Sequence, residues 1–165
     1  MKKYLLLVLI LAGLGTAVWG FGDKNQIPDV SGTAAVEIIK PAPPYVQIND
    51  IKIPVDLAQT EAEVQKGLSG LASLEAEKGM LFIFSKPDYY RFWMPDMNFP
   101  IDIIWLSQNT IAGIHKNVSN RFDSKNPKFY TPPQPVSRVL EVNAGFADFN
   151  NIKTGDPVSY FLDHD

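Results

Sequence analysis

The side chains best suited to chemistry gather between residues 91 and 102, in the segment RFWMPDMNFPID. This segment places two carboxylates, Asp96 and Asp102, beside several aromatic side chains, among them Trp93. Carboxylates next to aromatic walls can act as a general acid and base, or they can bind a polar ligand. The segment therefore predicts an acid–base site or a ligand-binding site.

Asp102 has two interpretations, because it interrupts an apolar run and a buried carboxylate needs hydrogen-bond donors. Arg91, Arg138, the Trp93 indole or backbone N–H groups of the preceding turn could supply them. In the functional interpretation, Asp102 works together with Asp96. In the structural interpretation, it locks the preceding turn by accepting main-chain hydrogen bonds. The candidate ligand-binding residues are Trp93, Met94, Asp96, Asp102 and Arg138.

Several common chemistries lack their residues in this chain. The sequence has no cysteine, which excludes disulfides, thiolate zinc sites, iron–sulfur clusters and cysteine nucleophiles. Its two histidines are His115, expected to be structural or solvent-facing, and His164 in the acidic C-terminal tail, so no histidine-rich metal site is predicted. Nucleotide-binding glycine motifs and the G-x-S-x-G elbow are also absent. We therefore expect no metal and no cofactor.

Composition and charge narrow the class of protein. The chain has 165 residues, of which 45 % are hydrophobic, as is normal for one globular domain. Its 15 basic and 18 acidic residues give a formal charge of −3, and no basic run follows residue 3. Because nucleic-acid binding needs a clustered positive surface, no nucleic-acid partner is expected.

Residues 1–22, MKKYLLLVLILAGLGTAVWGFG, form an apolar helix that is a signal peptide or a membrane anchor. Two lysines precede the uncharged residues 4–22, a pattern that engages the secretion machinery. Small residues before Phe21 permit cleavage, whereas Trp19 and Phe21 suit the interface of a retained helix. In both cases the remaining chain is exported, to the periplasm or the cell surface, and it stays attached to the membrane if residues 4–22 are not cleaved.

Residues 23–44 read as a proline-containing linker, and residues 45–165 as a single β-rich domain. The dipeptide Asn49-Asp50 between alternating runs predicts a hairpin. Thr60 followed by Glu63 forms a capping-box pattern, which predicts a helix of about two turns that stops at Gly67.

Short apolar runs separated by turn residues predict the strands of this domain. They cover residues 45–48, 51–55, 80–84, 91–94, 101–106, 110–118, 136–142 and 157–162, with a short helical turn at 144–149. Within residues 110–118, alternation places Ile111, Gly113 and His115 on one face. The fold class is mainly β, a compact sandwich or partly closed barrel with one or two short helices.

The chain carries, in order, the motifs GLSG (67–70), GMLFIF (79–84), FWM-x-D (92–96), PIDI (100–103), VLEV-x-AG (139–145) and GD (155–156). In this order they resemble the bacterial and archaeal family catalogued as domain of unknown function 192, over roughly residues 51–158. The resemblance implies a compact, mostly β fold behind an N-terminal signal or anchor. The family often has Asn at the position of Asp96, and the resemblance carries over no established catalytic residue.

Two functions are compatible with these residues. The first is a non-catalytic extracytoplasmic domain that binds a small polar ligand, an envelope glycan or a partner protein through Trp93, Asp96 and Asp102. The second is a small hydrolase or lyase in which Asp96 and Asp102 act as acid and base. The residues leave open whether the protein is an enzyme.

Overall fold

A computed structural model describes residues 43–162, which form seven strands and two short helices. In chain order they are β1 (Tyr45–Ile48), β2 (Ile51–Ala58), α1 (Glu61–Lys66), β3 (Gly79–Asp88), β4 (Ile101–Ser107), β5 (Thr110–Val118), β6 (Val136–Asn143), α2 (Phe146–Phe149) and β7 (Val158–Phe161). The predicted mainly β class is confirmed. The predicted N-terminal helix, most of the linker and His164 lie outside the described residues.

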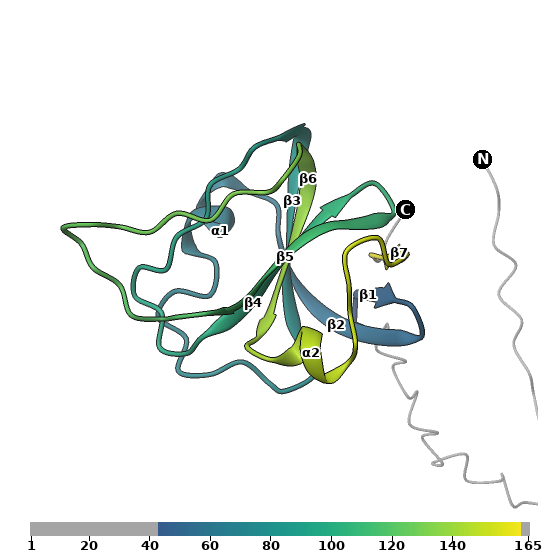
Figure 1. Cartoon of the computed structure of the whole chain (residues 1–165), viewed down its shortest axis with the longest axis horizontal. Helices are drawn as coiled ribbons and strands as arrows, with labels where there is room; N and C mark the ends of the chain where they lie inside the picture. The colour runs from purple at the N-terminus through teal and green to yellow at the C-terminus, as the bar shows by residue number, and fades with distance from the viewer. Residues whose placement is uncertain (1–42, 163–165) are drawn as a thin grey trace, which may run out of the picture. The chain divides into compact units, whose positions relative to one another are not determined.

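The strands form one curled sheet, a half-barrel, in the order β5-β4-β6-β3-β2-β1-β7 (Figure 1). Neighbouring strands are antiparallel except for β2 and β3, which run parallel. The two edge strands approach each other at an isolated bridge between Thr110 and Pro157, where the Val158 N–H donates to the Asn109 carbonyl over 2.7 Å. Of the two predicted architectures, the structure has the curled, partly closed form.

Alternation along the strands buries apolar side chains on both faces of the sheet. One cluster receives residues from all seven strands and therefore lies inside the curl; from β6 it takes Leu140 and Val142. A second cluster packs on the opposite face of β3, β4 and β6, where loops and α1 cover it; it includes Phe82 and Val139. Because side chains alternate along β6, Glu141 points to this second face, beneath the loops.

The helix α1 begins and ends where the sequence predicts. The Thr60 N–H donates to the Glu63 carboxylate over 2.9 Å, and the Thr60 hydroxyl accepts from the Glu63 N–H over 3.3 Å. Gly67 ends the helix with φ +48° and ψ −135°, a conformation that glycine enters most easily. The Asn49-Asp50 hairpin between β1 and β2 is confirmed as well.

Two local predictions are wrong. Residues 91–94 do not form a strand; their only ladder contact is one bridge between Phe92 and Tyr130, in a long loop. Ile111 does not share a face with Gly113, because the pairing of β5 with β4 slips by one residue between them. Such a bulge reverses the alternation, so Ile111 packs inside the curl while Gly113 contacts Pro133 on the other face.

Among residues 43–162, no helix has the length and apolar character needed to span a membrane.

Candidate functional site

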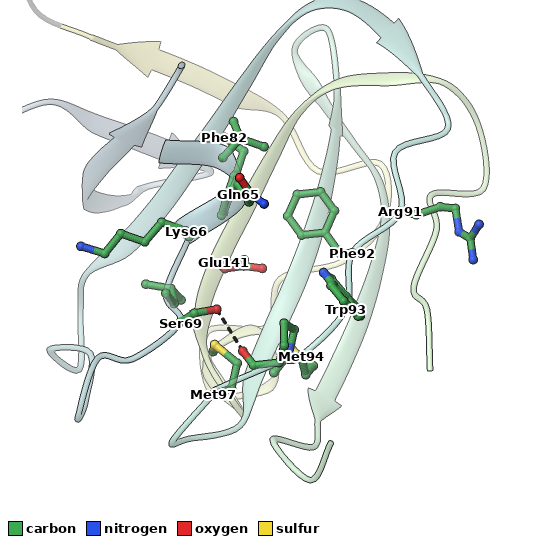
Figure 2. A pocket seen from close by; sticks show the side chains of 14 residues that line it. Gln65, Lys66, Ser69, Phe82, Arg91, Phe92, Trp93, Met94, Met97 and Glu141 are labelled. Atoms are coloured by element: carbon green, nitrogen blue, oxygen red, sulfur yellow. Dashed lines mark hydrogen bonds between the residues drawn. The ribbon is translucent and has the colours of Figure 1, made fainter. Parts of the chain in front are cut away.

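A pocket of about 210 Å³ opens between α1, the loop that follows it, and the loop that joins β3 to β4 (Figure 2). The carboxyl group of Glu141, from β6, lies in its wall. We call this cavity the Glu141 pocket. Its apolar wall residues include Leu68, Phe82, Phe92, Trp93, Met94 and Met97.

Glu141 reaches the pocket because of its register in the sheet. It lies in β6, opposite Met80 of β3 and Ile103 of β4, so apolar strands flank it on both sides. Only 5 % of the residue is exposed. Among residues 43–162, its carboxyl group takes part in no ion pair and no hydrogen bond, and burial raises its pKa to about 8. The pocket thus contains an unpartnered carboxyl group that is largely protonated at neutral pH.

Two cationic side chains, Lys66 and Arg91, also belong to the wall of the Glu141 pocket. Figure 2 shows both extending away from the Glu141 carboxyl group, in opposite directions. The Arg91 guanidinium lies 4.0 Å from the ring centroid of Phe129, in a cation–π contact. Neither cation forms an ion pair with Glu141.

The two loops at the rim of the pocket are tied to each other by hydrogen bonds. The Ser69 hydroxyl donates to the Pro95 carbonyl over 3.0 Å, and the Gly70 N–H donates to the Asp96 carbonyl over 2.9 Å. Asp96 has φ +54°, a left-handed conformation that Asp and Asn enter more readily than most residues. Its backbone therefore builds the rim while its side chain is exposed.

The structure brings two of the predicted ligand-binding residues, Trp93 and Met94, into the Glu141 pocket. Met94 is buried, whereas 49 % of Trp93 is exposed. The Trp93 indole stacks on Phe129 with centroids 5.8 Å apart and meets Phe122 edge-on at 5.5 Å. These contacts support the indole as one wall of the pocket.

Asp102 lies away from this pocket and is fully buried. Its Oδ1 accepts from the N–H groups of Asn117 over 2.8 Å and Gly145 over 3.2 Å, and its Oδ2 accepts from the N–H of Ala147 over 2.9 Å. The donors are main-chain groups, as in the structural interpretation, but they belong to β5 and to the start of α2 rather than to the 95–100 turn. Asp102 therefore joins β4, β5 and α2, and it is not paired with Asp96.

Arg138 lies on the other face of β6 from Glu141, by the alternation of the strand. Its guanidinium lies 4.4 Å from the ring centroid of Tyr160. The five predicted residues are therefore distributed over different parts of the domain, and only Trp93 and Met94 share a cavity.

Glu141 was not among the predicted site residues, although the sequence contains a signal for it. It interrupts the apolar run VLEV in the same way that Asp102 interrupts IDII. A carboxylate in an apolar strand must be paired or have a shifted pKa, and only the spatial neighbours decide which. Asp102 has three donors, whereas Glu141 has none among the described residues.

His115, which the sequence predicts to be structural or solvent-facing, forms a hydrogen bond within the domain. Its Nδ1 accepts from the Trp105 indole N–H over 2.7 Å, so the neutral ring carries its proton on Nε2. Burial, and next the charge of Lys128, lower the pKa of His115. Its ring helps to line a second cavity, of about 440 Å³, among polar and basic side chains. Among residues 43–162, no group of three His, Asp or Glu side chains could hold a metal ion.

Comparison with known proteins connects this geometry to a family. The model of the family DUF192, "Uncharacterized ACR", matches residues 45–160, well over half of the chain. The chain belongs to the DUF192 family. This confirms the resemblance predicted from its motifs.

Two solved structures are similar to this domain. A protein of unknown function from Novosphingobium aromaticivorans is 32 % identical, with a TM-score of 0.63 over 71 % of this chain and 83 % of that chain. A "putative transcription regulator" from Sinorhizobium meliloti is 24 % identical, with a TM-score of 0.64 over 71 % of this chain and 91 % of that chain. The second similarity shows the fold alone. No curated protein matches the chain.

Proposed function

We propose that this DUF192 domain binds a small ligand in the Glu141 pocket, with the ligand's polar group at Glu141 and its apolar body against the aromatic wall. The observation that carries the proposal is the carboxyl group of Glu141, which is only 5 % exposed, has no ion-pair or hydrogen-bond partner among residues 43–162 and lies in the wall of a cavity. The Glu141 oxygens have no hydrogen-bond partner among residues 43–162 and are not enclosed by protein atoms, so a ligand in the pocket could donate a hydrogen bond to them. A strongly raised pKa in a cleft is typical of a functional site.

The volume of the pocket limits what it can hold. A dry apolar cavity of about 150 Å³ takes up benzene, whereas pockets for drug-sized ligands span roughly 300–1,000 Å³. At about 210 Å³, the Glu141 pocket suits one ring or a short chain with a single polar group. Of the partner classes expected from the sequence, a small molecule therefore has the most support.

A hydrolase or lyase that uses Asp96 and Asp102 as acid and base has less support. Both oxygens of Asp102 accept main-chain hydrogen bonds, and the side chain of Asp96 is exposed at the rim. Neither Asp96 nor Asp102 lines the Glu141 pocket or the second cavity beside His115.

The binding proposal is tested with the methionine methyl groups of the pocket. In the full-length protein with 13C-labelled methionine methyls, a neutral single-ring alcohol such as 2-phenylethanol should shift the Met94 and Met97 signals. Removing the aromatic wall with Trp93→Ala should weaken binding about tenfold, on the scale of one lost aromatic contact. The matched control is Phe149→Ala, since Phe149 is 87 % exposed and lies outside the pocket. The proposal is wrong if no single-ring compound moves the two methyl signals.

We also propose that the domain works outside the cytoplasm. Support comes from the leader in residues 1–22, where two lysines precede an uncharged apolar stretch. A reporter enzyme that is active only after export, fused to the C-terminus, should be active with the complete chain and inactive once residues 1–22 are deleted. Equal activity of the two fusions would refute this.

A further inference from the structure

The Glu141 carboxyl group forms no ion pair among residues 43–162, although two cationic side chains belong to the same pocket wall. Lys66 and Arg91 contribute to the same wall, yet both extend into solvent, and Arg91 packs on Phe129 instead. The Glu141 carboxyl group therefore faces the pocket without an ion pair to either cation.

We propose that the ligand of the Glu141 pocket carries an ammonium group, which pairs with the Glu141 carboxylate against the aromatic wall, and that its binding releases the Glu141 proton to solvent. This inference rests on the proposed function and adds the chemical class of the ligand. The step forms an ion pair and breaks the carboxyl O–H bond, so a cation enters while a proton leaves, and the charge of the pocket does not change.

The composition of the wall favours an ammonium group over a neutral or anionic one. Rings of Phe82, Phe92 and Trp93 line the cavity, and the faces of aromatic rings attract cations most strongly where water is excluded. An ammonium–carboxylate hydrogen bond is roughly twice as strong as a neutral one. An anionic ligand would gain only a hydrogen bond from the protonated acid, and it would place its charge in an apolar cavity.

The charged groups around Glu141 allow a clear dependence on pH. Among residues 43–162, Lys66 from α1 and Arg91 from the β3–β4 loop are the only cationic side chains in the wall of the Glu141 pocket. The adjoining strands present apolar residues, Met80 from β3 and Ile103 from β4. Burial raises the pKa of Glu141 to about 8, so the charge of this carboxyl group changes near neutral pH.

The expected effect of pH on ligand binding follows from the pKa of Glu141. With the pKa of Glu141 near 8, about one carboxyl group in ten is ionised at pH 7, and about one in a hundred at pH 6. An alkylamine stays protonated throughout, as lysine does with a pKa of about 10.4. Its binding should therefore tighten about tenfold from pH 6 to pH 7, with release of nearly one proton per ligand at pH 7.

The experiment compares three probes that share one apolar body: phenethylamine, 2-phenylethanol and phenylacetate. Binding to the full-length protein is followed through the Met94 and Met97 methyl signals at pH 6, 7 and 8. Calorimetry at pH 7 in two buffers of different ionisation enthalpy counts the protons released. We expect phenethylamine to bind at least tenfold more tightly than 2-phenylethanol and phenylacetate at pH 8. Its binding should tighten about tenfold from pH 6 to pH 7 and release nearly one proton per ligand at pH 7.

Variants separate the ion pair from general effects on folding. Glu141→Gln should remove the pH dependence and weaken phenethylamine binding at pH 8 at least tenfold. Glu61→Gln, an exposed change outside the pocket, should leave both unaltered. If Glu141→Gln does not fold, the pH series and proton count on the unaltered protein still decide the question.

The outcomes distinguish this inference from the proposal on which it rests. If 2-phenylethanol binds as tightly as phenethylamine, or if amine binding does not change with pH, the ammonium inference is refuted while ligand binding in the pocket stands. If none of the three probes moves the methyl signals, the small-ligand proposal is contradicted together with it.

Discussion

Replacing Glu141 by glutamine should change how the stability of the domain depends on pH. The side chain is buried in the wall of an apolar pocket, and burial raises its pKa from the ordinary 4.5 to about 8. The pKa of Glu141 is higher in the folded state than in the unfolded state. At a pH between these two pKa values, the folded state therefore holds a proton that the unfolded state has released. The proton bound to Glu141 therefore contributes to the stability of the folded state in full below pH 4.5, and this contribution is lost as the pH rises from 4.5 to about 8.

The size of the effect follows from the pKa difference. One pKa unit corresponds to about 1.4 kcal/mol, so the full interval between 4.5 and 8 is roughly 5 kcal/mol. An experiment between pH 5 and pH 8 would capture about 3 kcal/mol of it. Glutamine has nearly the same shape and no proton to lose, so the Glu141→Gln variant should lack this part of the pH dependence.

The assay is urea unfolding of the purified full-length protein and of the variant at pH 5, 6, 7 and 8. Other groups titrate in both proteins, so the difference in unfolding free energy, wild type minus variant, isolates Glu141. This difference should fall by about 3 kcal/mol from pH 5 to pH 8. If the difference is flat over this range, the Glu141 carboxyl group has an ordinary pKa and the pocket does not desolvate it.

Two further predictions concern residues that shape the fold around the site. Asp102→Asn should lower the unfolding free energy by about 3–5 kcal/mol, because an amide NH₂ would face one of three buried N–H donors and the charge-assisted bonds would be lost. Urea unfolding at pH 7 measures this loss. A loss below about 1 kcal/mol would contradict the prediction. Gly67→Ala should lower the unfolding free energy by about 1–3 kcal/mol, because φ of Gly67 is +48° and a Cβ would lie 3.2 Å from the Phe82 ring. The same urea unfolding measures this change. Unchanged stability would show that this turn tolerates a side chain.

Local sequence patterns were enough to predict several elements. The capping box of Thr60 and Glu63 and the Asn49-Asp50 turn involve residues within four positions of each other, and both were found where expected. The mainly β class follows from apolar runs of strand length, and the motifs between residues 67 and 156 identified the family. Such features are decided by short-range hydrogen bonds and by the alternation of side chains, which can be read along the chain.

Features that depend on pairing across the sheet could not be predicted in this way. The one-residue slip in the pairing of β4 with β5 decides which side chains of β5 face the interior of the curl. No residue pattern within 110–118 predicts this slip. The donors of Asp102 come from Asn117, Gly145 and Ala147, which are distant in sequence.

The same distinction separates the two buried acids. Asp102 and Glu141 both interrupt apolar strands, so the amino-acid order marks each as a carboxylate that must be paired or perturbed. Their different roles arise only when the chain folds, because the free energy of a buried charge depends on the groups within a few ångströms of it. Main-chain donors converge on Asp102, whereas α1 and the β3–β4 loop enclose Glu141 with aromatic rings and direct their cations outward.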